Sequence, residues 1–313
     1  MNNIMDFDAG EVFGKKPSGK KVKGWAQRNP YTPQVDPHYR FPVWASDIVV
    51  WLLAMDEPLY LFGPTGCGKT SCVKQIVTKL NDPVYEVTGH SRLEFPEMVG
   101  HHTVKDGSMH FEYGPLALAM KHGGIFLLNE IDLLDPSTAA GLNSVLDGYP
   151  LSIPENGGEL IVPHEMFRFV ATANSNGGSD ETGLYQGVLR QNLAFMDRFV
   201  LVEAGYLPED LETEIVQSYT PDMDPDLVKK MLRFANAVRR LFIGDTAENI
   251  DMQIEITFST RSIIRWALLT TQFEPLRQKG IDVVQYALDR ALGYRASAPT
   301  YQVLRELKQR IFG

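Results

Sequence analysis

One short segment carries the residue types that hold phosphate groups. It runs from Gly63 to Thr70, reads GPTGCGKT, and follows an apolar run. It matches the pattern G-x-x-x-x-G-K-[ST], in which backbone N–H groups of a side-chain-poor loop point at phosphate oxygens. In that pattern the lysine reaches the β and γ phosphates and the threonine hydroxyl binds Mg²⁺. We therefore predict a nucleoside triphosphate and Mg²⁺ here, with binding residues Gly63, Pro64, Thr65, Gly66, Cys67, Gly68, Lys69, Thr70 and Ser71.

A second segment supplies a base that could activate water. The stretch GGIFLLNEID places Asn129 and Glu130 at the end of a predicted strand. P-loop folds put acidic residues beside the γ-phosphate at this position, so we predict that Glu130 is the general base. Asn129 stands where aspartate is usual and would bind Mg²⁺ through water; its amide brings no negative charge, so we expect weaker metal binding and slower turnover. Asp132 either compensates as a metal-binding group or caps the following segment, and the sequence leaves both roles open.

Three further polar residues follow at element ends. Asn174 ends the strand FRFVATAN, where it either lies near an attacking water or caps a turn. Arg198 precedes another strand and is predicted to reach a γ-phosphate as a finger, usually that of an adjacent subunit; an ion pair with Asp197 is the structural alternative. Arg261 occupies the first turn of a predicted helix, where a cation opposes the helix dipole, so we predict that it senses the γ-phosphate from a lid, with Arg265 as the alternative.

The elements that must position these residues predict an α/β core followed by a helical lid. Apolar runs at 58–62, 84–89, 125–129, 167–174 and 199–204 read as strands separated by helical segments. Such alternation predicts a mostly parallel sheet between helices, spanning residues 41–205. Beyond it the strand signal fades, and helices are predicted at 208–218, 225–241, 259–272, 281–293 and 299–311, which form a lid domain over 206–313.

Three segments fall outside this alternation. Residues 1–40 are rich in Gly, Pro and Lys with little periodicity, so we predict an extended N-terminal arm. Residues 100–114, with a turn at 105–108, and residues 151–163 each read as a hairpin.

Composition limits the class of partner and the compartment. The 313 residues carry a net charge of −9, which argues against a surface built to neutralise nucleic-acid phosphates. The two cysteines, Cys67 and Cys72, offer no disulfide framework, and the longest apolar stretch is too short to span a bilayer. We therefore expect a cytoplasmic protein without a membrane span.

Taken in order, the loop, Asn129-Glu130, Asn174, Arg198 and Arg261 resemble the AAA+ ATPases. Within them the chain is most similar to the MoxR-like, helix-2-insert branch and to its cobaltochelatase small subunits (CobS), from about residue 12 onward. The segments that carry this resemblance are EVFG, DPHYRF and FVATANSNGGSDETGLYQGVLRQNLAFMDRFVLVEAGYLPED.

The resemblance implies a hexameric ring that hydrolyses ATP with Mg²⁺ at subunit interfaces, where Arg198 completes the neighbouring site. The two hairpins would be the helix-2 insert and the pre-sensor hairpin of the family. It also implies a protein client, such as one with a von Willebrand A domain, and a link to metal insertion. Two alternatives remain: a DNA-linked helicase-like motor, which the scarcity of basic residues near the hairpin at 100–114 disfavours, and a nucleotide-gated assembly module with very slow hydrolysis, which Asn129 suggests.

Overall fold

The structure is a computed structural model that describes residues 3–14, 16–178 and 187–313. The chain divides into two compact units, each described by itself below. The α/β unit comprises Met1–Asp36, Val43–Pro64 and Lys69–Gly205. The helical unit comprises Pro37–Pro42, Thr65–Gly68 and Tyr206–Gly313, so the tip of the glycine-rich loop packs with the helices.

A parallel five-stranded sheet forms the centre of the α/β unit. Its strand order is β11-β3-β10-β7-β4, and each neighbouring pair is parallel. Apolar runs form these strands because they are covered on both faces; every residue of β7 is buried. The predicted α/β class with a mostly parallel sheet is confirmed. The strands are β3 (Leu59–Phe62), β4 (Val84–Thr88), β7 (Gly124–Asn129), β10 (Phe167–Ala173) and β11 (Val200–Glu203).

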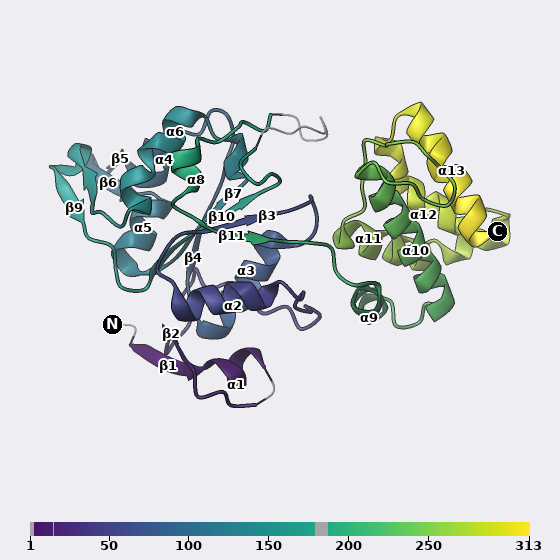
Figure 1. The fold of residues 1–313 in the computed structure, drawn as a ribbon, viewed down its shortest axis with the longest axis horizontal. Helices are drawn as coiled ribbons and strands as arrows, with labels where there is room; N and C mark the ends of the chain where they lie inside the picture. The colour runs from purple at the N-terminus through teal and green to yellow at the C-terminus, as the bar shows by residue number, and fades with distance from the viewer. Residues whose placement is uncertain (1–2, 15, 179–186) are drawn as a thin grey trace. The chain divides into compact units, whose positions relative to one another are not determined.

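Helices cover both faces of this sheet. Figure 1 shows α2 (Ala45–Ala54) and α3 (Lys69–Val77) on one face, with α4 (Phe95–Val99), α5 (Pro115–His122) and α6 (Pro136–Gly141) on the other. Side chains alternate along β7: Phe126 and Leu128 pack with α5, whereas Ile125 and Leu127 are also buried but point the other way. The sheet is thus the middle layer of three.

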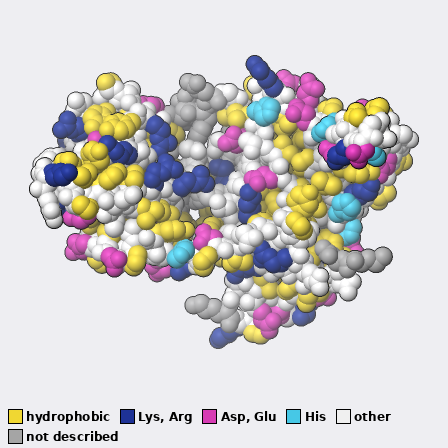
Figure 2. All heavy atoms as spheres, turned by 180° about the vertical axis from the view of Figure 1, so that it is seen from behind, with side chains coloured by type: hydrophobic (Ala, Val, Ile, Leu, Met, Phe, Trp, Pro, Cys, Tyr) yellow, Lys and Arg dark blue, Asp and Glu magenta, His cyan; other side chains and the backbone are white. Residues whose placement is uncertain are grey.

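Two antiparallel hairpins extend from the α/β unit. One pairs β5 (Gly100–Lys105) with β6 (Ser108–Tyr113), and the other pairs β8 (Leu151–Ile153) with β9 (Glu159–Ile161). The hairpins touch, because the Tyr113 hydroxyl donates to Glu159 Oε2 at 2.7 Å. Figure 2 shows histidine and charged side chains gathered at the end of the unit where β5 and β6 lie. Among the described residues, no group of three or more His, Cys, Asp or Glu side chains is arranged to hold a metal ion.

The N-terminal segment differs from the extended arm that the sequence suggests. It contains β1 (Ile4–Asp8), α1 (Ala9–Phe13) and β2 (Lys21–Trp25), with β1 and β2 antiparallel. The Asp8 carboxylate closes this segment by accepting backbone N–H bonds from Ser18, Gly19, Glu11 and Gly10, which lower its pKa to about 2. These hydrogen bonds link residues up to eleven positions apart in the sequence, so a local apolar periodicity cannot predict them.

The helical unit packs five helices around an aromatic core of Phe234, Phe258 and Trp266. Asp or Ser side chains cap the starts of four helices, as expected for N-cap positions. No described helix is both long enough and apolar enough to cross a bilayer. The helices are α9 (Glu209–Tyr219), α10 (Pro225–Phe242), α11 (Thr260–Gln272), α12 (Val283–Ala291) and α13 (Ala298–Phe312); the shorter elements of the chain are α7 (Asn143–Leu146), α8 (Leu193–Met196), and the 3₁₀ turns η1 (Thr78–Leu80), η2 (Ile131–Leu133), η3 (Pro154–Asn156), η4 (Glu274–Lys279) and η5 (Gly293–Arg295).

Candidate active site

The glycines of the loop after β3 are required by close packing and backbone conformation. Gly63 has φ +151°, and a Cβ there would lie 2.0 Å from the carbonyl oxygen of Ala204. Gly66 has φ +77°, and a Cβ there would lie 2.3 Å from the Cβ of Ser259, within the helical unit. Any other residue would force the backbone to move at both positions. The loop runs into α3 at Lys69, so the helix begins with its free N–H groups at the loop.

Lys69 lies folded against its own loop. Its buried ammonium group donates to the carbonyl oxygens of Gly63 at 2.7 Å and Pro64 at 3.1 Å. It also donates to Asn174 Oδ1 at 3.3 Å. The structure therefore brings Lys69 and Asn174, two predicted site residues from distant parts of the chain, into contact. A bound phosphate would compete with these oxygen acceptors for the ammonium group.

Thr70 and Asn129 face each other across the ends of α3 and β7. The Thr70 hydroxyl donates to Asn129 Oδ1 at 2.5 Å, and Thr172 Oγ1 donates to the same oxygen at 3.1 Å. The other end of the amide, Nδ2, donates to Glu86 Oε1 at 2.7 Å. Hydroxyl and amide oxygens are hard metal ligands of the kind that Mg²⁺ prefers, so the side chains of Thr70 and Asn129 fit this metal ion.

Sequence reasoning misses Glu86 and Thr172. Glu86 lies on β4, an edge strand, where an acidic residue reads as an ordinary solvent-facing side chain. Thr172 is a buried residue within the apolar strand β10. Neither carries a motif, and only the side-by-side placement of β4, β7 and β10 brings them to Asn129.

Glu130 has a backbone conformation that is uncommon for a residue with a side chain. Its φ is +54°, in the left-handed region, and its side chain is exposed at the carboxyl end of β7. The turn is held because Gly89 N donates to the Asn129 carbonyl at 2.7 Å, and a Cβ on Gly89 would lie 2.5 Å from the Glu130 carbonyl oxygen. Such strain costs about 1 kcal/mol or more and is typical of functional positions.

Asp132 contacts the end of β10, next to Asn174. It is fully buried, and its Oδ2 accepts from the backbone N–H groups of Asn174 at 2.9 Å and Ser175 at 3.1 Å. Burial raises the pKa of this carboxyl group, and the hydrogen bonds from Asn174 and Ser175 oppose that rise. These bonds go to the end of β10, so Asp132 holds the backbone that presents Asn174. Its predicted metal-binding and capping roles stay predictions.

Arg198 lies at the opposite end of the sheet from the loop. It precedes β11, whose Val200 pairs in register with Leu59 at the start of β3. Both strands have four residues, so at a rise of about 3.3 Å per residue their first and last residues lie about 10 Å apart. The Arg198 guanidinium pairs with Asp147, at 2.8 Å from Nε to Oδ1, and not with Asp197. The Arg198 guanidinium therefore cannot reach a phosphate bound on the loop of its own subunit.

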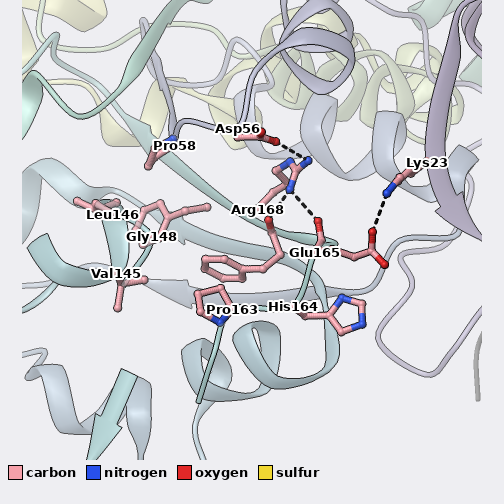
Figure 3. Close-up of a pocket in the computed structure, with 12 residues that line it drawn as sticks. Lys23, Asp56, Pro58, Val145, Leu146, Gly148, Pro163, His164, Glu165 and Arg168 are labelled. Carbon is pink, nitrogen blue, oxygen red and sulfur yellow. Dashed lines mark hydrogen bonds and ion pairs between the residues drawn. The ribbon is translucent and has the colours of Figure 1, made fainter. Parts of the chain in front are cut away.

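The surface around this amino edge of the sheet is hollowed and polar. Arg198 and Asp147 line a depression of about 760 Å³. A neighbouring depression of about 530 Å³, drawn in Figure 3, is lined by charged residues from several elements. In it Arg168 reaches Asp56 at 3.1 Å and Lys23 reaches Glu165 at 2.6 Å.

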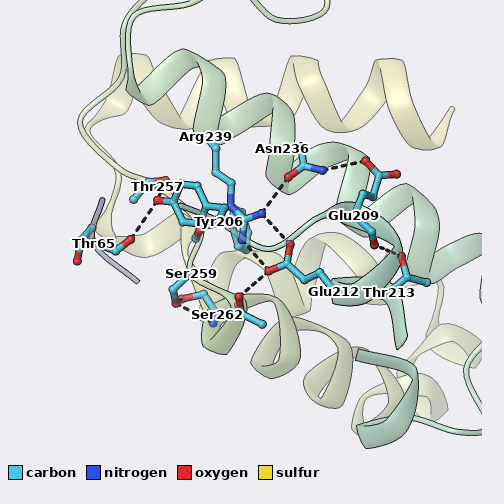
Figure 4. Close-up of polar contacts among 12 residues, drawn as sticks. Thr65, Tyr206, Glu209, Glu212, Thr213, Asn236, Arg239, Thr257, Ser259 and Ser262 are labelled. Atoms are coloured by element: carbon cyan, nitrogen blue, oxygen red, sulfur yellow. Dashed lines mark hydrogen bonds and ion pairs between the residues drawn. The ribbon is translucent and has the colours of Figure 1, made fainter. Parts of the chain in front are cut away.

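Arg261 projects from the start of α11 in the helical unit. It is exposed, as is Arg265 one turn later, while Ser259 caps the helix by accepting from Ser262 N at 3.1 Å. Figure 4 shows the polar contacts that hold this region. Thr260 Oγ1 donates to Glu212 Oε1 at 2.6 Å, which fixes the residue before Arg261.

The same contacts reach the tip of the glycine-rich loop. Glu212 forms a buried, two-point ion pair with Arg239, with N–O distances of 2.7 and 2.8 Å. The Arg239 guanidinium lies 4.1 Å from the centre of the Tyr206 ring, and the Tyr206 hydroxyl donates to the Thr65 carbonyl at 3.0 Å. Figure 4 shows these side chains converging from α9, α10 and the loop tip. The helical unit thus holds Thr65 by a charged, largely buried network.

Part of the segment on which the family resemblance depends, residues 179–186, lies outside the described residues. Every residue predicted to take part in the site lies within the described part of the chain.

Comparisons with known proteins show which family the chain resembles. Residues 58–199 match the family model described as AAA domain (dynein-related subfamily), and residues 212–311 match the one described as CbbQ/NirQ/NorQ C-terminal. The aerobic cobaltochelatase subunit CobS of a Sinorhizobium species is 31% identical over 266 residues, which cover 82% of this chain and 78% of that protein.

Two further relatives have other names. The denitrification regulatory protein NirQ of Stutzerimonas stutzeri is 30% identical over 225 residues, covering 70% of this chain and 78% of that protein. Protein NorQ of Paracoccus denitrificans (strain Pd 1222) is 28% identical over 267 residues, covering 83% of this chain and 88% of that protein.

Proposed function

Because the chain belongs to the MoxR-like AAA+ ATPases, with CobS, NirQ and NorQ among its relatives, we propose that it is a Mg²⁺-dependent, ring-forming ATPase that remodels or activates a partner protein complex. The family resemblance predicted from the sequence is confirmed.

ATP would bind with its phosphates on the loop. The backbone N–H groups from Thr65 to Gly68 and at the start of α3 offer donors to the phosphate oxygens. The Lys69 ammonium would exchange the Gly63 and Pro64 carbonyls for the β and γ phosphates. Thr70 and Asn129 would hold Mg²⁺, which neutralises phosphate charge when bound.

Hydrolysis would use the polar residues at the carboxyl ends of β7 and β10. Glu130, exposed beside Asn129, takes a proton from water, whose oxygen then attacks the γ-phosphorus as ADP departs. Asn174, whose amide oxygen already contacts Lys69, orients that water. Arg261 at the start of α11 is the candidate γ-phosphate sensor of the helical unit.

One observation carries the assembly part of the proposal: Arg198 lies at the amino edge of the sheet, opposite the loop. An arginine there can stabilise the γ-phosphate only of a second copy of the chain, so a complete site needs two subunits. A closed ring gives every subunit one such neighbour, and by family resemblance we propose six subunits. The charged, hollowed surface around Arg198 supports this edge as the subunit interface.

The partner remains a narrower proposal. One relative is named as a cobaltochelatase subunit, so a client complex with a link to metal insertion suits that name. We propose a von Willebrand A domain protein as client, with the two hairpins as the contacting surface, and the cytoplasm as the compartment. Net charge of −9 makes nucleic acid a poor client.

A second candidate function is supported by Asn129. Because this buried position is neutral, the chain could use ATP mainly to stabilise the ring, with very slow hydrolysis. Comparing the ATPase rate of the wild type with that of Asn129→Asp separates the two: ordinary turnover in the wild type rules out the assembly-only function.

A trapping experiment tests the main proposal. We would measure Mg²⁺-dependent ATP hydrolysis of the wild type and of Glu130→Gln, then use the variant with ATP to capture the client. The proposal expects a loss of hydrolysis of about 100-fold or more with retained ATP binding. It fails if the wild type neither binds nor hydrolyses ATP, or if Glu130→Gln hydrolyses at the wild-type rate.

A further inference from the structure

The Asn129 side chain is enclosed by three polar partners. It is 7% exposed, its Oδ1 accepts from the hydroxyls of Thr70 and Thr172, and its Nδ2 donates to Glu86. The hydroxyls can donate or accept, so they alone would tolerate either orientation of the amide. The carboxylate of Glu86 can only accept, so it fixes the amide with Nδ2 toward β4 and Oδ1 toward Thr70.

This orientation matters for Thr70. With Oδ1 in front of it, the Thr70 hydroxyl directs its proton at Asn129 and keeps its oxygen lone pairs available for another ligand. In the flipped amide, the NH₂ group would donate to the Thr70 oxygen and occupy a lone pair there. The Glu86 contact therefore favours the arrangement in which both lone pairs of the Thr70 hydroxyl stay available to a metal ion.

We propose that Glu86 is a positioning residue for the metal-binding end of the active site, acting through the orientation of the Asn129 amide. This inference rests on the proposed function, because it concerns the Mg²⁺ that accompanies ATP. It also gives a reason for asparagine at position 129, because an aspartate would set a second carboxylate against Glu86 at about the present 2.7 Å separation.

Orientation, and not net charge, is the effect assigned to Glu86. Its second oxygen is paired with Lys74 Nζ at 2.5 Å, and the two side chains are 35% and 30% exposed. A carboxylate that is neutralised by a neighbouring ammonium and screened by water contributes little field at the metal. We therefore assign the effect of Glu86 to the hydrogen bond that it accepts from Asn129 Nδ2.

A set of variants separates these effects. In the Glu130→Gln background we would measure the Mg²⁺ concentration that half-saturates binding of a fluorescent ATP analogue, and the melting temperature without nucleotide. Glu86→Ala should raise the Mg²⁺ requirement roughly three- to tenfold, the range that the net contribution of an ordinary hydrogen bond gives. Glu86→Gln should stay within about twofold of the parent, because its amide oxygen still accepts from Asn129.

Two further proteins serve as controls. Glu203→Ala removes an exposed glutamate from β11, the other edge strand, and should change neither quantity. In Asn129→Ala, the additional change Glu86→Ala should have no further effect, because the residue through which Glu86 acts is gone.

The outcomes are distinguishable from failure of the proposed function. If the parent binds no nucleotide, the ATPase proposal fails, and the melting temperatures still show whether Glu86 and Asn129 are coupled. If the parent binds but Glu86→Ala behaves like it, Glu86 does not position the site. An effect of Glu86→Ala that persists in Asn129→Ala, or an equally large effect of Glu86→Gln, also overturns the proposal.

Discussion

Replacing Asp132 by alanine should loosen the backbone that presents Asn174. The Asp132 carboxylate accepts from the N–H groups of Asn174 and Ser175 and from the Ser175 hydroxyl at 3.3 Å. The hydroxyl can turn to another acceptor, but the two N–H groups cannot. A buried donor left without a partner costs about 1–3 kcal/mol, so two of them set an upper range of about 2–6 kcal/mol.

Two features of the structure place the expected value at the low end. Asn174 and Ser175 are only half-buried, so water can reach part of this region in the variant. The wild-type carboxylate also carries a desolvation penalty, which is why burial raises its pKa. We expect Asp132→Ala to lower the free energy of unfolding by about 2 kcal/mol, and Asp132→Asn, which keeps one acceptor oxygen, by about 1 kcal/mol.

Urea unfolding of the α/β unit in the whole chain measures these differences, and ATPase rates measured well below the unfolding midpoint report on Asn174. Hydrolysis should fall more than nucleotide binding, because Asn174 orients water whereas Lys69 holds phosphate. An Asp132→Ala protein as stable as the wild type, with unchanged hydrolysis, would refute the role assigned to Asp132.

Three other changes have defined outcomes. Gly63→Ala should abolish measurable ATP binding and lower the melting temperature, because its Cβ would lie 2.0 Å from the Ala204 carbonyl oxygen; normal binding would contradict the loop geometry. Asn129→Asp should lower the melting temperature of the nucleotide-free protein by repulsion from Glu86, and adding Glu86→Gln should restore it. Burial raises the pKa of Asp82, whose Oδ1 has no hydrogen-bond partner among the described residues. The wild type should therefore lose stability relative to Asp82→Asn as pH rises from about 4 toward 7, because the unfolded chain ionises first; parallel pH profiles of unfolding would contradict this.

Much of the architecture follows from local sequence signals. The strands of the sheet are largely apolar segments of four to seven residues, and four of the five helices of the helical unit begin at Asp or Ser caps, so both are visible in the chain. The N-terminal β1 and β2 were not predicted, because the four backbone bonds to Asp8 and the packing of Val22 near Leu80 are tertiary contacts.

Some residues of the site can likewise be predicted from the sequence, and others cannot. The loop and Glu130 are recognisable because phosphate binding and water activation demand particular residues in sequence. Glu86 and the true partner of Arg198, Asp147, are not recognisable, because parallel strands and packed helices bring together residues about 43 and 51 positions apart. Asp132 shows the same limit: its position two residues after Glu130 suggests a metal or cap role, whereas the fold turns it toward β10.

Complementation between two inactive chains tests the central claim most directly. Arg198→Ala lacks the arginine for the neighbouring site, and Glu130→Gln lacks the base for its own site. In an equal mixture that assembles at random, roughly a quarter of the interfaces should join an intact Glu130 to an intact Arg198, so ATP hydrolysis should recover to about that fraction of the wild-type rate. Mixed assemblies that form normally yet hydrolyse no more ATP than either variant alone would contradict a site shared between subunits.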